Sequence, residues 1–184
     1  CVYLASDLLA VAPPLSEGAS ARIEMRLKEI DERYQVLDLL SDDLYDSIVT
    51  YGIAYHHSGL VPQIRLAVEA LLKEGYLRFC VATMGLSLGI NFSVRSTVIT
   101  DYGRPGDQGF TSYSPAETLQ MLGRAGRRGS DVVGYNLWLG RASFKILSGA
   151  GKENCASRLR VEPSTLMGLV SRGYAVAQLD HVFS

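Results

Sequence analysis

The sequence has few cysteines and no excess of basic charge. Its 184 residues include three cysteines, 18 lysine and arginine residues, and 19 aspartate and glutamate residues, which give a net charge of −1. Cys1, Cys80 and Cys155 are far apart and form no Cys-x-x-Cys pair, which argues against a disulfide framework or a zinc site and favours a reducing cytoplasmic or nuclear compartment. The balanced charge excludes a protein-wide basic field, so any nucleic-acid site must be local.

The chain also lacks a membrane span, a targeting segment and a nucleotide-phosphate loop. Charges, glycines or prolines interrupt every apolar run well before the roughly 20 residues that a span needs. Because the first residues include neither an initiator methionine nor a signal core, we expect a piece of a longer protein. No Gly-x-x-x-x-Gly-Lys-Ser/Thr and no Gly-x-Gly-x-x-Gly motif is present, so the chain alone is not expected to hold nucleotide phosphates in the P-loop manner.

Apolar residues recur with helical spacing through much of the chain. Hydrophobic residues make up 47% of the sequence and charged residues 20%, as in folded globular domains. Between Ile23 and Leu37 the apolar spacing alternates between four and three residues, which predicts an amphipathic helix with Ser20 as a possible N-cap. Other helices are predicted at 2–11, at 42–50 with a cap at Ser41 or Asp42, at 62–75 and at 115–122.

Short apolar runs between these helices predict strands. They lie at 53–55, at 79–83, from 94 or 96 to 100, and at 135–139. Strands that alternate with helices at this rhythm predict βαβ units with right-handed crossovers, and therefore an α/β domain with a central, mostly parallel sheet. Residues 102–111 are expected to form a surface loop, and the glycine-rich segment 148–152 a hinge before two short helices at 164–172 and 176–183.

An arginine- and glycine-rich segment, Gln120 to Gly129, follows the helix predicted at 115–122. Arg124 and Arg127 are three residues apart, so their side chains can converge on one anion, and the interleaved glycines allow close approach of the backbone. A guanidinium group presents a planar fork that matches phosphate oxygens, as in an arginine finger on a γ-phosphate. The spacing alone also fits a flexible surface turn or a nonspecific RNA contact.

The segment Gln-x-x-Gly-Arg-Ala-Gly-Arg-Arg-Gly resembles motif VI of superfamily-two helicases of the superkiller type. Two further blocks agree with this family in order and separation. The run Gly52 to Leu60, which contains His-His-Ser-Gly-Leu, resembles motif IVa, and the run from Ala82 to Arg95 resembles motif V. The resemblance covers the second RecA-like domain of such helicases.

The resemblance implies a domain organisation. Residues 1–147 would form the second RecA-like domain, without motif IV and the domain's first strand. Residues 148–154 would form a linker, and 155–184 the helical start of a truncated winged-helix domain. ATP would be bound, with Mg²⁺, mainly by an N-terminal RecA-like domain of the same protein, and the other partner would be single-stranded or partly duplex RNA or DNA. No membrane partner is expected.

The resemblance also implies roles for individual residues. Arg124 and Arg127 would reach the γ-phosphate of ATP, and Gln120 would lie near the same phosphate or the attacking water. Gly89 and Asn91 would lie beside the nucleotide. The residues expected to hold phosphates of the nucleic-acid strand are Thr83 and the loop of His57, Ser58 and Gly59.

Two positions depart from the family pattern and keep an alternative open. Gly85 stands where relatives commonly have threonine, and Ser93 where they usually have proline. The lost hydroxyl group removes one possible strand contact, and serine relaxes a loop that proline would stiffen. The alternative function is a nonenzymatic nucleic-acid-binding module or a degenerate helicase.

Several other polar and aromatic residues are expected to have structural roles. His56 and His57 should point to opposite faces of an extended segment, so one of them should be packed, and no carboxylate or cysteine pattern accompanies them as metal ligands. Trp138 is expected to belong to the core, and Asp42 and Asp43 to form a solvated helix cap.

Overall fold

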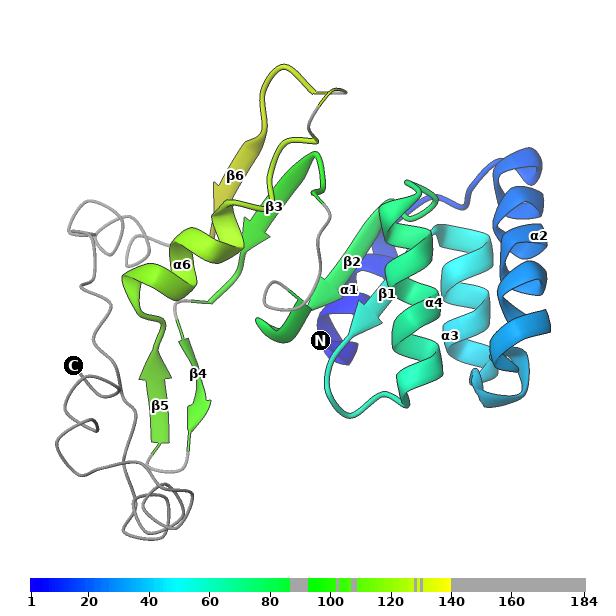
Figure 1. Ribbon diagram of the computed structural model, residues 1–184, viewed down its shortest axis with the longest axis horizontal. Helices are drawn as coiled ribbons and strands as arrows, with labels where there is room; N and C mark the ends of the chain where they lie inside the picture. The colour runs from blue at the N-terminus through cyan, green and yellow to red at the C-terminus, as the bar shows by residue number, and fades with distance from the viewer. Residues whose placement is uncertain (87–92, 102, 107–108, 128, 130, 140–184) are drawn as a thin grey trace, which may run out of the picture. The chain divides into compact units, whose positions relative to one another are not determined.

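The computed structural model describes residues 1–86, 93–101, 103–106, 109–127, 129 and 131–139 (Figure 1). Its helices are α1 (Val2–Val11), α2 (Glu17–Tyr34), α3 (Asp42–Asp46), α4 (Pro62–Lys73) and α6 (Pro115–Leu122), with a short 3₁₀-helix η1 (Leu37–Leu39) and a π-helical turn η2 (Ser47–Tyr51). Its strands are β1 (Ile53–His56), β2 (Phe79–Ala82), β3 (Ser96–Ile99), β4 (Gly103–Gly106), β5 (Gly109–Ser112) and β6 (Tyr135–Trp138).

The chain divides into two compact units, residues 1–151 and 152–184. All described residues belong to the first unit. The linker predicted at 148–154 and the domain start predicted at 155–184 lie outside the described residues, so both stay predictions. No helix in the described part of the chain is long and apolar enough to cross a membrane.

The amphipathic helix α2 buries the predicted face, but its cap differs from the prediction. Ile23, Leu27 and Ile30 are buried along one side. The helix begins at Glu17, because Ser16 rather than Ser20 is the N-cap: the Ser16 carbonyl accepts hydrogen bonds from the N–H groups of residues 19 and 20. The first turn carries no large apolar residue, so the hydrophobic period could not reveal it.

The helix predicted at 42–50 is present as α3 followed by η2. The Ser41 side chain accepts a hydrogen bond from the Leu44 N–H, which confirms the predicted serine cap, and Asp42 and Asp43 are solvent-exposed as expected. The segment ends at Gly52, whose φ of 68° is in the left-handed region that glycine adopts without strain. Chain reversal at this glycine leads directly into β1.

Strands β1 and β2 are parallel neighbours connected through α4, as the predicted βαβ unit requires. Ile53 pairs with Phe79, and both Ile53 and the adjacent Ala54 are fully buried. Neighbouring residues of a strand point to opposite faces, so both faces of β1 are covered. Helices α1 and α4 both contact the strand (Figure 1). The main core cluster joins α2, α3, η2, β1 and α4; its largest members include Leu27, Leu44, Ile48 and Leu71.

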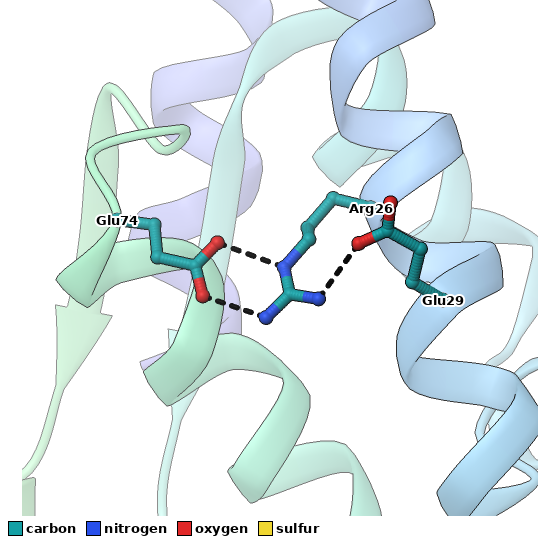
Figure 2. A network of polar contacts seen from close by, with 3 residues as sticks. All are labelled: Arg26, Glu29 and Glu74. Atoms are coloured by element: carbon teal, nitrogen blue, oxygen red, sulfur yellow. Dashed lines mark hydrogen bonds and ion pairs between the residues drawn. The ribbon is translucent and has the colours of Figure 1, made fainter.

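A polar network on the surface ties α2 to the end of α4 (Figure 2). The guanidinium of Arg26 donates from Nε and Nη2 to the two carboxylate oxygens of Glu74, at 2.8 and 2.7 Å. Its Nη1 donates to Glu29 at 2.8 Å. These hydrogen bonds raise the pKa of Arg26, and the contact with Glu74 has the largest effect. The bidentate contact links α2 to Glu74, the residue that follows α4.

The second half of the described chain holds the parallel pair β3–β6 and a hairpin. Ile99 pairs with Trp138, which is half-buried rather than fully in the core. Among the described residues the parallel strands form two pairs, β1–β2 and β3–β6, not one continuous sheet. The prediction of a loop at 102–111 is wrong, because strands β4 and β5 pair in antiparallel fashion there. Their sequences, Gly-Arg-Pro-Gly and Gly-Phe-Thr-Ser, are rich in residues that ordinarily indicate loops.

Candidate functional site

The residues predicted to contact a nucleic-acid strand come together after two neighbouring strands. β1 ends at His56 and β2 at Ala82, and these two residues are partners in the parallel register. The Thr83 N–H donates to the His56 carbonyl at 3.1 Å, so Thr83 lies beside the start of the loop of residues 57–59. Thr83, Ser58 and Gly59 are all solvent-exposed. The fold therefore groups hydroxyl and backbone donors at the carboxyl edge of this sheet.

The loop of residues 57–59 is held by the His57 ring. Nδ1 of His57 accepts a hydrogen bond from the Gly59 N–H at 3.1 Å, and the ring stacks on Tyr55 with centroids 5.7 Å apart and planes 9° apart. A Cβ on Gly59 would lie 3.0 Å from His57 Nδ1, so this close contact favours glycine. The Gly59 N–H is thus already engaged, whereas the Ser58 and Thr83 side chains are exposed hydroxyl groups of this edge.

His56 has a structural environment that the sequence did not reveal. Its side chain is only 7% exposed, and Nε2 lies 2.8 Å from Oε1 of Glu69 on α4. The expectation that one of the two histidines is packed is confirmed, and Glu69 is a hydrogen-bond partner that the sequence did not indicate. Glu69 is 13 positions away, and the packing of α4 against β1 brings it close. Within the described ranges no group of three metal-ligating side chains is present.

Helix α6 has the predicted bounds and a complete capping box. The Ser114 hydroxyl accepts from the Glu117 N–H at 3.2 Å, and the Glu117 carboxylate accepts from the Ser114 N–H at 2.8 Å. The hydrogen bond from the Ser114 backbone, with help from Arg104, holds the pKa of Glu117 below its usual range. Such a cap fixes the start of the helix. Gln120 lies in the last turn of α6 and is exposed.

The turn after α6 is hydrogen-bonded to the segment before β3. The Val94 N–H donates to the Arg124 carbonyl at 2.8 Å, and the Gly126 N–H donates to the Val94 carbonyl at 2.7 Å. Gly126 has a φ of 91°, and the backbone of Gly134 packs against Ala125 and Gly126. Arg124 is half-buried in this turn. These backbone contacts determine where the next residue, Arg127, leaves the turn.

Arg127 forms a closely coupled pair with Asp131, a residue that the sequence analysis did not single out. Nε and Nη2 of Arg127 donate to the two carboxylate oxygens of Asp131 at 2.9 and 3.1 Å, and the Arg127 backbone N–H donates to the same carboxylate at 2.9 Å. Hydrogen bonds from the Arg127 side chain and backbone lower the pKa of Asp131 to about 2. The side-chain hydrogen bond to Asp131 also raises the pKa of Arg127. Opposite charges four residues apart were the available signal in the sequence.

Arg127 also lines a surface hollow of about 480 Å³ together with Arg95, Asp131 and Tyr135. Arg124 is not among the lining residues of this hollow, so its convergence with Arg127 on one anion stays a prediction. Gly89 and Asn91, predicted to lie beside the nucleotide, lie outside the described residues. Two arginines around one hollow make this an anion-attracting surface.

The sequence matches a known family. Residues 24–129, more than half of the chain, match the family described as the helicase conserved C-terminal domain. The chain is 31% identical over 130 residues to the antiviral helicase SKI2 of Saccharomyces cerevisiae, a match that covers 67% of this chain and 10% of that protein. It is 38% identical over 96 residues to the ATP-dependent DNA helicase Hel308 of Thermoplasma volcanium, covering 52% of this chain and 14% of that protein.

A plant protein extends the comparison. The DExH-box ATP-dependent RNA helicase DExH9 of Arabidopsis thaliana is 37% identical over 106 residues, which are 53% of this chain and 11% of that protein. The chain thus spans only a small part of each of these relatives. The family match contains all three motifs noted in the sequence and confirms the predicted α/β, RecA-like class. The chain belongs to the helicase C-terminal domain family, in the superkiller type of superfamily-two helicases.

Proposed function

We propose that this chain is the C-terminal motor half of an ATP-dependent nucleic-acid helicase. The observation that carries the proposal is the hydrogen bond between Thr83 and the His56 carbonyl, which joins two segments that are far apart in the sequence. The resemblance to the helicase family implies that both segments hold strand phosphates. A motor that moves along a strand needs such sequence-independent contacts, because it must grip every nucleotide alike.

The proposed nucleotide site is shared between two domains. Arg124 and Arg127 reach the γ-phosphate of ATP, and Gln120 acts near that phosphate or the attacking water. Gly89 and Asn91 lie beside the nucleotide. ATP and Mg²⁺ are held mainly by an N-terminal RecA-like domain of the same protein, since this chain has no phosphate loop. The chemistry assigned to this chain is charge stabilisation in the transition state.

The proposed domain organisation of the chain has three parts. Residues 1–147 form the second RecA-like domain, 148–154 a linker, and 155–184 the start of a winged-helix domain. The substrate is single-stranded or partly duplex nucleic acid, in the cytoplasm or nucleus. RNA and DNA both remain in the proposal, because the printed names of the relatives include a DNA helicase and an RNA helicase.

The proposal is tested by the ATPase activity of the full-length protein with and without single-stranded RNA or DNA. We expect turnover that rises when a strand is added, and the polymer that stimulates more identifies the substrate class. An absence of turnover with either polymer, together with retained strand binding, would support the nonenzymatic binding module instead. Gly85 gives that alternative its basis, since it places no hydroxyl group next to Thr83.

The strand contact gives a separate prediction. Thr83→Ala removes an exposed hydroxyl group at the sheet edge and is expected to weaken single-strand binding by about 1 kcal/mol, the typical net value of one hydrogen bond. The loss should be nearly equal for all base sequences, because a phosphate contact carries no sequence information. Fluorescence anisotropy with labelled oligonucleotides of different sequence measures it. A base-specific loss, or none, would move Thr83 out of the strand-binding surface.

A further inference from the structure

We propose that Asp131 is a positioning residue that orients Arg127 for the γ-phosphate of ATP. This inference rests on the proposed function, which assigns Arg127 to that phosphate. Asp131 lies beyond residues 24–129, the part of the chain that matches the family.

The carboxylate of Asp131 occupies only one edge of the Arg127 guanidinium. It accepts from Nε and from Nη2, which form the side-on edge of the planar group. A guanidinium carries five N–H donors, so three stay unused: two on the end-on edge formed by Nη1 and Nη2, and one more on Nη1. Within the described part of the chain, no residue is bonded to Nη1. One edge is therefore anchored while the other can hold phosphate oxygens.

The anchor itself is well fixed. The Asp131 side chain is 10% exposed, whereas that of Arg127 is 47% exposed. The same carboxylate also accepts the Arg127 backbone N–H, and the Asp131 N–H donates to the Arg127 carbonyl at 2.9 Å. Backbone and side-chain bonds thus close one ring between the two residues. A largely covered acceptor that holds a half-exposed donor restricts the rotamers of a long side chain, which would otherwise have to be ordered when ATP binds.

Arg95 adds a second positive charge beside the pair. It lines the same hollow as Arg127 and Asp131, and its positive charge acts on the Asp131 carboxylate. Asp131 compensates charge between two arginines, so both can stand near one hollow without strong mutual repulsion.

The test uses the full-length protein with a saturating concentration of single-stranded RNA or DNA. Asp131→Asn keeps the shape of the side chain and removes its charge. We expect kcat for ATP to fall by about tenfold to a hundredfold, the scale of a small misplacement of a catalytic group, with little change in KM. In a background that already carries Arg127→Ala, Asp131→Asn should have no further effect on kcat, because a positioning residue acts only through its partner.

Controls separate this effect from loss of folding. Glu29→Gln removes one carboxylate from the surface network around Arg26 (Figure 2). This change also removes a partner of a surface arginine, but away from Arg127, so kcat should be unchanged. Asp131→Glu retains the charge but shifts it, and its kcat should lie between those of the wild type and Asp131→Asn. Thermal unfolding of each variant identifies any that fail to fold, and Asp131→Glu is then compared in place of Asp131→Asn.

The outcomes distinguish the inference from the function on which it rests. If Arg127→Ala itself leaves kcat unchanged, the proposed role of Arg127 is wrong and the inference falls with it. If Arg127→Ala lowers kcat but Asp131→Asn does not, or if the two losses multiply independently, Asp131 does not act through Arg127. A rise in kcat for Asp131→Asn would also overturn the proposal, because it would mean that Asp131 restrains the arginine instead of preparing it.

Discussion

Arg127→Lys is expected to lower the strand-stimulated kcat of the full-length protein by roughly 10³-fold, the scale known for arginine fingers. Lysine keeps the positive charge but has no planar fork, so it can neither bind Asp131 through two nitrogens nor present a second edge to a phosphate. The effect should be on kcat more than on KM, since a finger that meets the γ-phosphate as the two domains close stabilises the transition state. Steady-state ATPase assays measure both constants.

The control for this prediction is the neighbouring Arg128. Arg128→Lys should change kcat far less if only Arg127 reaches the nucleotide. Strand affinity in the absence of nucleotide should be nearly unaffected in Arg127→Lys. A variant that keeps stimulated ATPase but loses strand binding would show instead that the arginine- and glycine-rich segment is a nucleic-acid clamp.

Gly134→Ala is expected to produce the second large effect. A Cβ at this position would lie 2.5 Å from the carbonyl carbon of Ala125 and from the nitrogen of Gly126, both of them backbone atoms. The turn that leads to Arg127 would have to move, because neither atom can rotate away. We expect a loss of about 1–3 kcal/mol in the free energy of unfolding, as for other overpacked sites, together with a reduced kcat. Chemical denaturation and the ATPase assay measure the two quantities.

Gly18→Ala is the matched control for that substitution. Gly18 lies in α2, and a Cβ there would meet only the end of the Arg22 side chain at 3.9 Å, which is ordinary contact. Stability should be equal or slightly higher, since alanine has the better helix propensity, and kcat should be unchanged. If Gly134→Ala has the stability and kcat of the wild type, the close packing of Gly134 against the backbone of Ala125 and Gly126 is contradicted.

Local patterns predicted most of the regular elements. The bounds of α6 and the ends of α1 and α4 follow from prolines, glycines and apolar spacing, which act within one or two turns of a helix. The hairpin β4–β5 was missed because its strands consist largely of residues that favour loops, and their pairing depends on each other rather than on local propensity. The same limit applies to strand order, which long-range contacts decide.

Part of the candidate site was also predictable. Thr83 and the loop of residues 57–59 both follow short strands, and parallel neighbours place their carboxyl ends at one edge. Their hydrogen-bonded partners were not predictable in this way. Glu69 reaches His56 because α4 packs on β1, and Asp131 is bonded to Arg127 through its backbone N–H as well as its carboxylate. The contact between Glu69 and His56 depends on helix packing, so residue spacing does not reveal it, whereas the spacing of four residues between Arg127 and Asp131 was an available signal.

The central claim, that this chain supplies only one half of an ATP site, is tested most directly by calorimetric titration of ATP into the isolated chain. Far-ultraviolet circular dichroism should first establish that the chain is folded. Without a phosphate loop, the chain should bind ATP with a Kd weaker than about 1 mM, which corresponds to about −4 kcal/mol, while the full-length protein binds more tightly. Micromolar binding of ATP by the isolated, folded chain would contradict the account.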